Sequence, residues 1–219
     1  MTSLGNSVVG AVLAGGQSRR LGQDKALLPW SGAALLLRPF EILQAVFSEV
    51  VVVTVSGRAY EDLGVSVIHD RFEGQGPLAG IHAALEWAGS RPVFVTACDL
   101  PNISVELVDH VADGGNGSPA IASKSEELQA HPRARIAVWN GRQQPLFGLY
   151  SATCREPIEA RLRDGRLEAW RFLADIDATP VPITPELEFY KPDLLLNVNS
   201  QADLQPRSPE RAHEPSRSR

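Results

Sequence analysis

Short apolar runs alternate with longer segments of helical periodicity along the first half of the chain. Residues 8–13 and 49–55 are apolar runs rich in valine, which are typical of strands covered on both faces in a parallel sheet. Between them the apolar positions repeat at the spacing of one helix face. That face consists of Leu36, Phe40, Leu43 and Phe47. Pro39 fits such a helix in its first turn, where a missing N–H is tolerated.

The same alternation continues toward the middle of the chain. Strands are predicted at residues 65–68 and 92–97, and a helical stripe between them is formed by Ile81, Ala84, Leu85 and Ala88. Ser104 is suited to cap a further helix that runs through Val111, because a serine hydroxyl accepts hydrogen bonds from the free N–H groups of a helix start. This β-α-β-α order predicts an open α/β sheet with helices on both faces.

The second half of the chain is less regular. Two strands are expected around Asn140–Gly141, joined by a turn longer than two residues. The expected elements are strands at 136–139 and 145–150, helices at 156–163 and 167–174, and a last strand at 194–198. Residues 205–219 contain only Pro, Ser, Arg, Glu, Ala, His and Gln, a composition that favours disorder. We therefore expect one folded domain over residues 1–204 and a disordered tail over 205–219.

Composition and charge exclude several classes of protein. Of the 219 residues, 43% are apolar, and the formal net charge is −5. The apolar share is enough for a proper core, and the mild acidity argues against a nucleic-acid partner, which would need a basic face. No run approaches the ~18 apolar residues of a membrane span, and the N-terminus does not resemble a signal peptide. We therefore expect a cytoplasmic protein with no membrane partner.

The segment after the first strand carries the most informative chemistry. Gly15 and Gly16 lack β-carbons, so backbone N–H groups there can approach a ligand closely. Arg19, Arg20 and Lys25 follow within ten residues. Glycines and cations at the carboxyl end of a strand suit a nucleoside triphosphate, although neither GxxxxGK[ST] nor GxGxxG is present. The alternative is an ordinary turn with surface arginines.

Five segments resemble, in order, the motifs of one enzyme family. They are residues 13–25 (LAGGQSRRLGQDK), 68–70 (IHD), 76–80 (GPLAG), 98–101 (CDLP) and 197–200 (NVNS). From about residue 8 to residue 204 the chain is similar to the molybdenum cofactor guanylyltransferases, a branch of the α/β nucleotidyltransferases. The resemblance implies a Rossmann-like three-layer sandwich with a mostly parallel central sheet, and it makes residues 1–204 a nucleotidyltransferase domain.

The resemblance also implies an activity. Members of this family transfer GMP from GTP to the terminal phosphate of molybdopterin cofactor and release pyrophosphate, with Mg²⁺ as the metal cofactor. The implied partners are therefore GTP and molybdopterin cofactor, with contacts to a molybdoenzyme or a chaperone left open. The alternatives are a CTP-dependent molybdopterin or sugar-phosphate nucleotidyltransferase, and a non-catalytic nucleotide-sensing domain.

Asp99 follows a predicted buried strand, so its carboxylate should emerge at the carboxyl edge of the sheet. A carboxylate there suits Mg²⁺, which takes few protein oxygens; the alternative is a turn or helix cap. By resemblance, the catalytic residues are Lys25, Arg20 and Asp99, with Asp99 as the metal ligand and the two cations on the departing pyrophosphate. The implied nucleotide-binding residues are Leu13, Ala14, Gly15, Gly16, Lys25, Asp70 and Asp99.

Asn197 and Asn199 lie two apart on the expected last strand, so their side chains should share one face. We assign them to the second substrate or to the metal shell; the alternative is that they satisfy loop backbone. Two departures from the family pattern weaken other contacts. Thr54 stands where the family often has asparagine, which affects base selectivity. Residues 143–146 (QQPL) replace an HPT-like segment on the pterin side.

Overall fold

The computed structural model describes residues 7–15, 24–55, 60–115, 133–198 and 203. The strands are β1 (Val9–Leu13), β2 (Pro29–Trp30), β3 (Ala33–Ala34), β4 (Glu49–Thr54), β5 (Val67–His69), β6 (Val93–Ala97), β7 (Ala134–Trp139), β8 (Arg142–Tyr150) and β9 (Thr179–Ile183). The helices are α1 (Leu37–Val46), α2 (Pro77–Ala88), α3 (Val105–Asp113), α5 (Arg155–Arg163) and α6 (Ala169–Asp175). Short 3₁₀ turns are η2 (Lys25–Leu27), η3 (Glu61–Leu63) and η5 (Ala152–Cys154).

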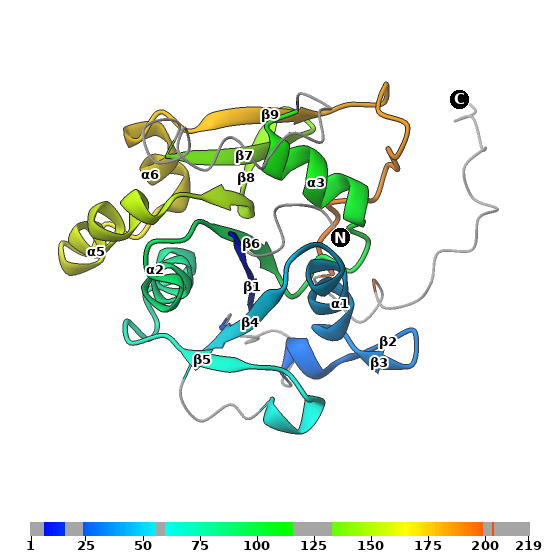
Figure 1. Ribbon diagram of the computed structural model, residues 1–219, viewed down its shortest axis with the longest axis horizontal. Coiled ribbons are helices and arrows are strands. Elements are labelled where there is room, and N and C mark those ends of the chain that lie inside the picture. The colour runs from blue at the N-terminus through cyan, green and yellow to red at the C-terminus, as the bar shows by residue number, and fades with distance from the viewer. Residues whose placement is uncertain (1–6, 16–23, 56–59, 116–132, 199–202, 204–219) are drawn as a thin grey trace, which may run out of the picture.

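One sheet forms the middle layer, with the strand order β5-β4-β1-β6-β8-β7-β9 (Figure 1). Each neighbouring pair is parallel except those that β8 makes with β6 and β7. In the centre, Val12 on β1 lies opposite Val52 on β4 and Thr96 on β6. The sheet is therefore mostly parallel, and the carboxyl ends of β1, β4, β5, β6 and β7 meet at one edge.

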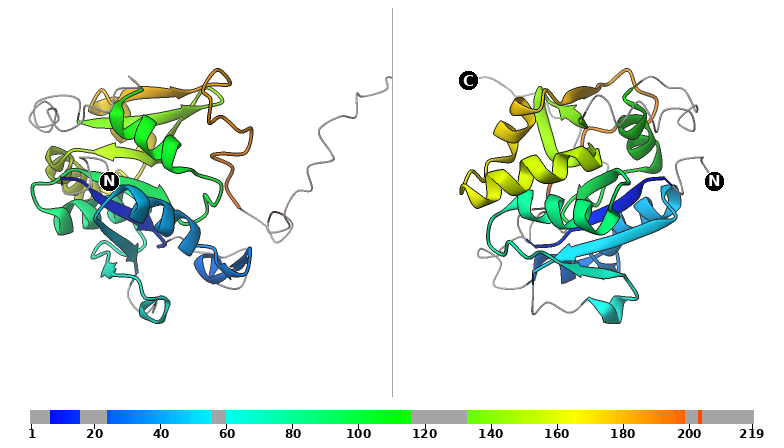
Figure 2. Two further views of the ribbon diagram at one scale, coloured as in Figure 1. Left: turned by 45° about the vertical axis from the view of Figure 1, so that its right-hand side comes forward. Right: turned by 60° about the vertical axis from the view of Figure 1, so that its left-hand side comes forward.

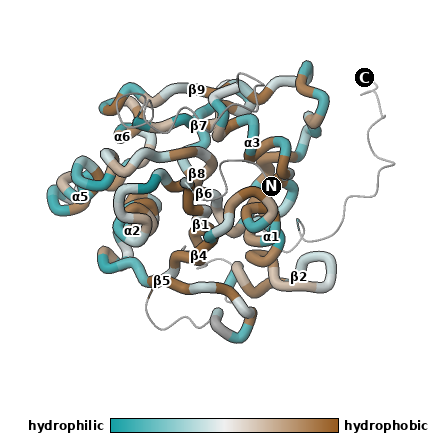
Figure 3. Tube along the Cα trace, viewed as in Figure 1, coloured by the Kyte–Doolittle hydropathy of each residue, from teal (hydrophilic) through white to brown (hydrophobic). Residues whose placement is uncertain are grey.

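Helices cover both faces of this sheet (Figure 2). One apolar core lies between the sheet and the α1–α3 layer, and it includes Phe40, Leu43 and Leu107. A second core lies between the opposite face and α2, α5 and α6, with Ile81 and Ile158 among its buried members. The hydropathy colouring shows apolar residues along β1 and β4, in the middle of the molecule (Figure 3). The predicted three-layer α/β sandwich is confirmed.

The helix starts follow from local sequence. Pro39 lies in the first turn of α1 and Pro77 is at the start of α2, positions where a missing N–H does no harm. Ser104 caps α3, its hydroxyl accepting a hydrogen bond from Leu107 N at 3.3 Å. The start of α3 therefore lies where the sequence predicts it, shortly after Asp99 along the chain.

The turn between β7 and β8 differs from the expectation. We expected a connection longer than two residues, but β8 already begins at Arg142 and pairs it with Trp139. The turn is therefore the two residues Asn140 and Gly141, whose φ angles are 50° and 71°. Asn-Gly tolerates positive φ at both positions, which is what a tight hairpin turn requires.

The expected last strand at residues 194–198 is wrong, because that segment is a turn followed by irregular structure. The last described strand is β9, which lies at the edge of the sheet beside β7. The sequence of β9 contains Pro180 and Pro182, and prolines in strands are confined to such edges because they cannot donate to a further strand. The expected tail over 205–219 lies outside the described residues, and the boundary at residue 204 stays a prediction.

Among the described helices none has the length and apolar character needed to cross a membrane.

Candidate active site

The ends of three strands converge at the carboxyl edge of the sheet. Ala14 follows β1 and donates its N–H to Val53 O at 2.8 Å on β4. On the other side of β1, Cys98 N donates to Leu13 O at 3.1 Å. These two hydrogen bonds continue the parallel pairing of β1 with β4 and β6 beyond the ends of the strands. Gly15 and Asp99 therefore follow neighbouring strands at the same edge of the sheet.

Lys25 and Asp99 form an ion pair at this edge. Lys25 Nζ lies 2.7 Å from Asp99 Oδ2, and the exposed fractions of the two side chains are 17% and 15%. Asn197 Nδ2 approaches the same oxygen at 3.4 Å. The pair joins residues that are 74 positions apart in the sequence, so the fold brings together the Gly-rich segment and the end of β6.

The other oxygen of Asp99 is the most informative atom of the site. Asp99 Oδ1 is buried and has no hydrogen-bond partner within the described part of the chain. Buried polar atoms are nearly always paired, so this oxygen is placed for a ligand. No group of three or more His, Cys, Asp or Glu side chains that could hold a metal is found among the described residues. A single carboxylate oxygen fits a divalent cation such as Mg²⁺, which completes its shell with phosphates and water.

Lys25 is fixed by its preceding residue. Asp24 Oδ1 accepts a hydrogen bond from Ala26 N at 3.1 Å and thereby caps η2, the short turn that Lys25 begins. Asp24 Oδ2 accepts a second bond at 2.7 Å from the hydroxyl of Tyr60, a fully buried side chain. Both oxygens of Asp24 are therefore used to hold the backbone from which Lys25 extends toward Asp99.

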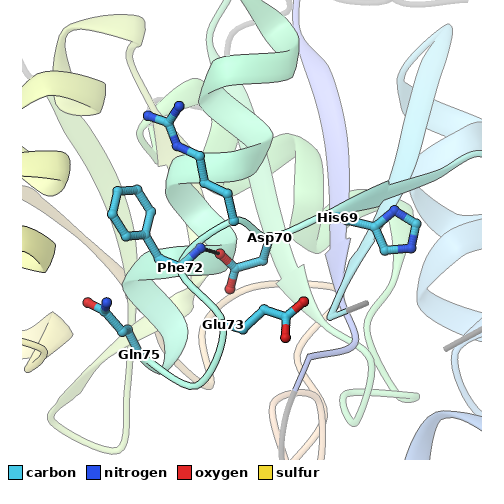
Figure 4. A pocket seen from close by; sticks show the side chains of 6 residues that line it. His69, Asp70, Phe72, Glu73 and Gln75 are labelled. Carbon is cyan, nitrogen blue, oxygen red and sulfur yellow. Dashed lines mark hydrogen bonds between the residues drawn. The ribbon is translucent and has the colours of Figure 1, made fainter. Parts of the chain in front are cut away.

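A hollow of about 600 Å³ lies beyond the end of β5 (Figure 4). It is lined by His69, Asp70, Arg71, Phe72, Glu73 and Gln75. Asp70 is 8% exposed and accepts a hydrogen bond from Phe72 N at 2.7 Å. Burial raises the pKa of Asp70, since the backbone bond offsets the loss of water only in part and the Glu73 carboxylate adds to the rise.

Two features make this hollow rich in hydrogen-bond acceptors. Gln75 Oε1 is buried without a partner among the residues that the structure describes. Arg71, which also lines the hollow, pairs with Glu86 of α2 at 3.0 Å and with Glu159 of α5 at 3.1 Å. The hollow therefore suits a neutral ligand group that donates hydrogen bonds rather than an anion.

Cys98 does not have the properties of a nucleophile. Burial raises the pKa of its thiol to about 12, and the neighbouring Asp99 carboxylate adds to the rise. The thiolate is the reactive form of cysteine, so a thiol with this pKa is inert at neutral pH.

Comparison with known proteins agrees with this geometry. Residues 10–179 match the family model of the MobA-like NTP transferase domain. A probable molybdenum cofactor guanylyltransferase of Mycobacterium avium is 35% identical over 204 residues, which is 90% of this chain and 93% of the relative. One from Aquifex aeolicus is 33% identical over 193 residues, 88% of this chain and 86% of the relative. The chain belongs to the molybdenum cofactor guanylyltransferase family.

A solved structure supports the family assignment. The molybdopterin-guanine dinucleotide biosynthesis protein A of Archaeoglobus fulgidus superposes with a TM-score of 0.69 at 26% identity, covering 90% of this chain and 94% of that one. As a molybdenum cofactor guanylyltransferase family member, the chain is an enzyme of the nucleotidyltransferase class.

The structure places the expected site residues of this guanylyltransferase family member as follows. Those on the active edge and within the described residues are Leu13, Ala14, Gly15, Lys25, Asp70, Asp99 and Asn197. Lys25, Asp99 and Asn197 are in direct contact, whereas Asp70 lies at the end of β5, with β4 and β1 between it and β6. Gly16, Arg20 and Asn199 lie outside the described residues. The shared strand expected for Asn197 and Asn199 is wrong, because Asn197 lies in an irregular segment.

Several residues around the family site were not anticipated from the sequence. Asp24 could have been, because aspartate directly before a helical turn is a standard N-cap. Tyr60 could not be anticipated from the sequence, since it reaches Asp24 across 36 positions.

Thr54, which was expected to affect base selectivity, is fully buried, and its hydroxyl has no partner among the described residues. Its carbonyl accepts a hydrogen bond from Asp70 N at 2.8 Å.

Proposed function

We propose that this chain transfers GMP from GTP to the terminal phosphate of molybdopterin cofactor, producing the guanine dinucleotide form of the cofactor and pyrophosphate. The names of its relatives support the donor and the acceptor. The observation that carries the proposal is the Lys25–Asp99 pair with its one unpaired carboxylate oxygen, at the sheet edge where the Gly-rich segment begins. Ligands bind at this edge in open α/β sheets.

In the proposed reaction an oxygen of the acceptor phosphate attacks the α-phosphorus of GTP. A new P–O bond forms while the bond from the α-phosphorus to the bridging oxygen breaks, and pyrophosphate leaves with that electron pair. The attacking phosphate is already ionised, so no general base is required. Catalysis then consists mainly of positioning and charge neutralisation.

Each predicted site residue has a role in this proposed scheme. Lys25 neutralises charge on the departing pyrophosphate as a compact ammonium. Gly15 brings backbone N–H groups close to the phosphates, and Leu13 and Ala14 support that approach from the end of β1. Arg20 shares the phosphate charge and Gly16 extends the cradle, as the sequence predicts. Asn197, with Asn199, is assigned to the second substrate or to the metal shell.

Nucleotidyltransferases typically use a divalent metal, which fits the Asp99 Oδ1 atom that has no partner among the described residues, and we propose Mg²⁺ as that metal. Bound there, Mg²⁺ would supply positive charge against the phosphates of GTP. Lys25 meanwhile occupies Oδ2, so the carboxylate keeps one oxygen for the cation and one for the protein. Asp99 thus orients both positive charges with a single side chain.

The hollow at Asp70 is proposed to receive the base. Guanine carries N–H donors on its N1 and N2 atoms, and the Asp70 carboxylate and Gln75 Oε1 are acceptors. Asp70 is already fixed by Phe72 N at 2.7 Å, so its orientation does not depend on the ligand. A preorganised acceptor of this kind discriminates between bases, because a base without the matching donor leaves it unpaired.

The test is pyrophosphate release by the purified chain with GTP, CTP, ATP and UTP, each with and without molybdopterin. We expect release with GTP that requires both molybdopterin and Mg²⁺. A preference for CTP would overturn the assignment of the base. Binding of GTP with no pyrophosphate release, in the presence of authentic molybdopterin, would overturn the catalytic proposal and favour a sensing domain.

A further inference from the structure

A second pair of residues holds the segment that brings Asn197 to Asp99. Asn102 lies three residues after Asp99, and its Nδ2 donates to Asp193 O and to Asp193 Oδ2, both at 3.2 Å. The two residues are 91 positions apart in sequence. Both residues are partly buried, so the two hydrogen bonds are partly accessible to water.

Residues 193–198 cross over the Asp99 loop and are fixed at both ends. At the first end, Asp193 is held by Asn102. At the other end, Val198 N donates to Asp99 O at 2.9 Å. Between the two ends Leu194 and Leu195 are 1% and 2% exposed and belong to the core beneath α1 and α3. We call residues 193–198 the crossing segment.

The contact between Asn197 and Asp99 is weak by itself. Asn197 Nδ2 lies 3.4 Å from Asp99 Oδ2, near the limit for a hydrogen bond, and Asn197 is exposed. A bond of this length contributes little energy toward ordering its own backbone. The position of Asn197 must therefore come from the anchors on either side of it.

From this geometry we infer that Asn102 is a positioning residue: through Asp193 it fixes the crossing segment so that Asn197 meets Asp99 on Oδ2. Lys25 contacts the same oxygen, so both donors bind Oδ2, and Oδ1 has no hydrogen-bond partner in the described part of the chain. Asn102 thereby acts on the orientation of the carboxylate without touching substrate. The inference rests on the proposed function of Asp99.

The variant pair Asn102→Leu and Asp193→Asn separates this role from simple packing. Leucine has the same number of side-chain heavy atoms as asparagine, with the same branching, but it has no donor, so both bonds are lost. Asparagine at position 193 keeps the main-chain carbonyl and a side-chain oxygen as acceptors. We expect Asn102→Leu to lower kcat about tenfold, because loss of two hydrogen bonds can account for an effect of this size. The Mg²⁺ concentration that gives half the maximal rate should rise, and KM for GTP should not change. Asp193→Asn should stay within about twofold of wild type.

Coupling to Asn197 is the decisive kinetic test. If Asn102 acts through Asn197, the variant Asn102→Leu/Asn197→Ala should be no slower than Asn197→Ala alone. Independent effects that multiply in the double variant would overturn the inference. Equal losses in Asn102→Leu and Asp193→Asn would also overturn it, since the second variant keeps the acceptors.

Hydrogen exchange gives a readout that does not depend on turnover. The amides of Leu196 and Val198 are hydrogen-bonded to Asp193 O and Asp99 O. We expect both to exchange about tenfold faster in Asn102→Leu, with amides in α2 unchanged. Unchanged exchange at both positions would overturn the inference even if the wild-type chain released no pyrophosphate. Faster exchange with wild-type kcat and Mg²⁺ dependence would overturn the positioning role while leaving the proposed function intact.

Discussion

Asp99 and Asp70 each follow a parallel strand at the same edge of the sheet, yet their surroundings differ. Asp99 is paired with Lys25 at 2.7 Å and keeps one buried oxygen that has no partner among the residues the structure describes. Asp70 is bound by the backbone of Phe72, and burial raises its pKa. These surroundings underlie the proposal that the first carboxylate binds a cation and the second a hydrogen-bond donor. The end of a parallel strand therefore brings an aspartate to this edge of the sheet, and the residues around the carboxylate determine what it can bind.

The strongest test of this contrast replaces each aspartate by asparagine. Asp99→Asn should lower kcat by roughly 100- to 1000-fold, because it removes the negative charge proposed to hold both the divalent cation and Lys25 against the reacting phosphates. Asp70→Asn should mainly raise KM for GTP, by about tenfold, because a carboxamide presents one acceptor where the carboxylate has two. Steady-state pyrophosphate release at saturating Mg²⁺ measures both. A large loss of kcat in Asp70→Asn with unchanged KM would remove the distinction.

A smaller effect should come from Tyr60→Phe, which sharpens the Lys25 side of the comparison. It removes the hydroxyl that binds Asp24 Oδ2 at 2.7 Å and leaves a buried ring in place. We expect about 1–2 kcal/mol less free energy of unfolding in urea. Since the backbone of Lys25 loses the support that Tyr60 gives through Asp24, kcat should fall about fivefold while the Asp70 pocket is unaffected.

A change in KM for GTP as large as that in kcat would show instead that Tyr60 supports both regions. Tyr150→Phe is the matched control for a lost buried hydroxyl. Tyr150 OH donates to Pro145 O at 2.6 Å within β8, so its loss should cost stability without changing the Mg²⁺ dependence of the rate.

The smallest effect concerns stability against pH. The pKa of Asp70 is raised above 3.8 in the folded chain, so ionising it costs more folded than unfolded. This cost is absent at pH values below the pKa that Asp70 has in the unfolded chain, and it is complete at pH values above its pKa in the folded chain. We expect Asp70→Asn to melt higher than wild type at pH 7, with the difference shrinking as the pH falls toward 3.8, measured by thermal denaturation. An equal shift at every pH would assign the effect to packing.

The sequence was sufficient for the architecture because that information is local. Valine runs, the Ser104 cap and the prolines at helix starts each act over a few residues, and the strands and helices lie close to where these patterns put them. The last strand was missed for the same reason. Pro180 and Pro182 read locally as strand breakers, and only the edge position beside β7 makes them compatible with β9.

The candidate site was predictable where a residue follows a strand and unpredictable where partners come from afar. Asp99 could be placed at the sheet edge from the run before it. The contacts that orient it could not, because Tyr60 reaches Asp24 and Asp193 reaches Asn102 across long stretches of chain. Asn197 shows both limits, since its approach to Asp99 was not evident and its expected strand does not form.

The crossing segment has a consequence for how the enzyme is made on the ribosome. Asp99 and Asn197 are separated by 98 positions, and β1, β4, β5 and β6 all precede the segment that bridges them. The parallel half of the sheet can thus emerge and pair while the site is still incomplete. Completion must wait until residue 198 has left the exit tunnel, so the growing chain acquires its finished edge only near the end of synthesis.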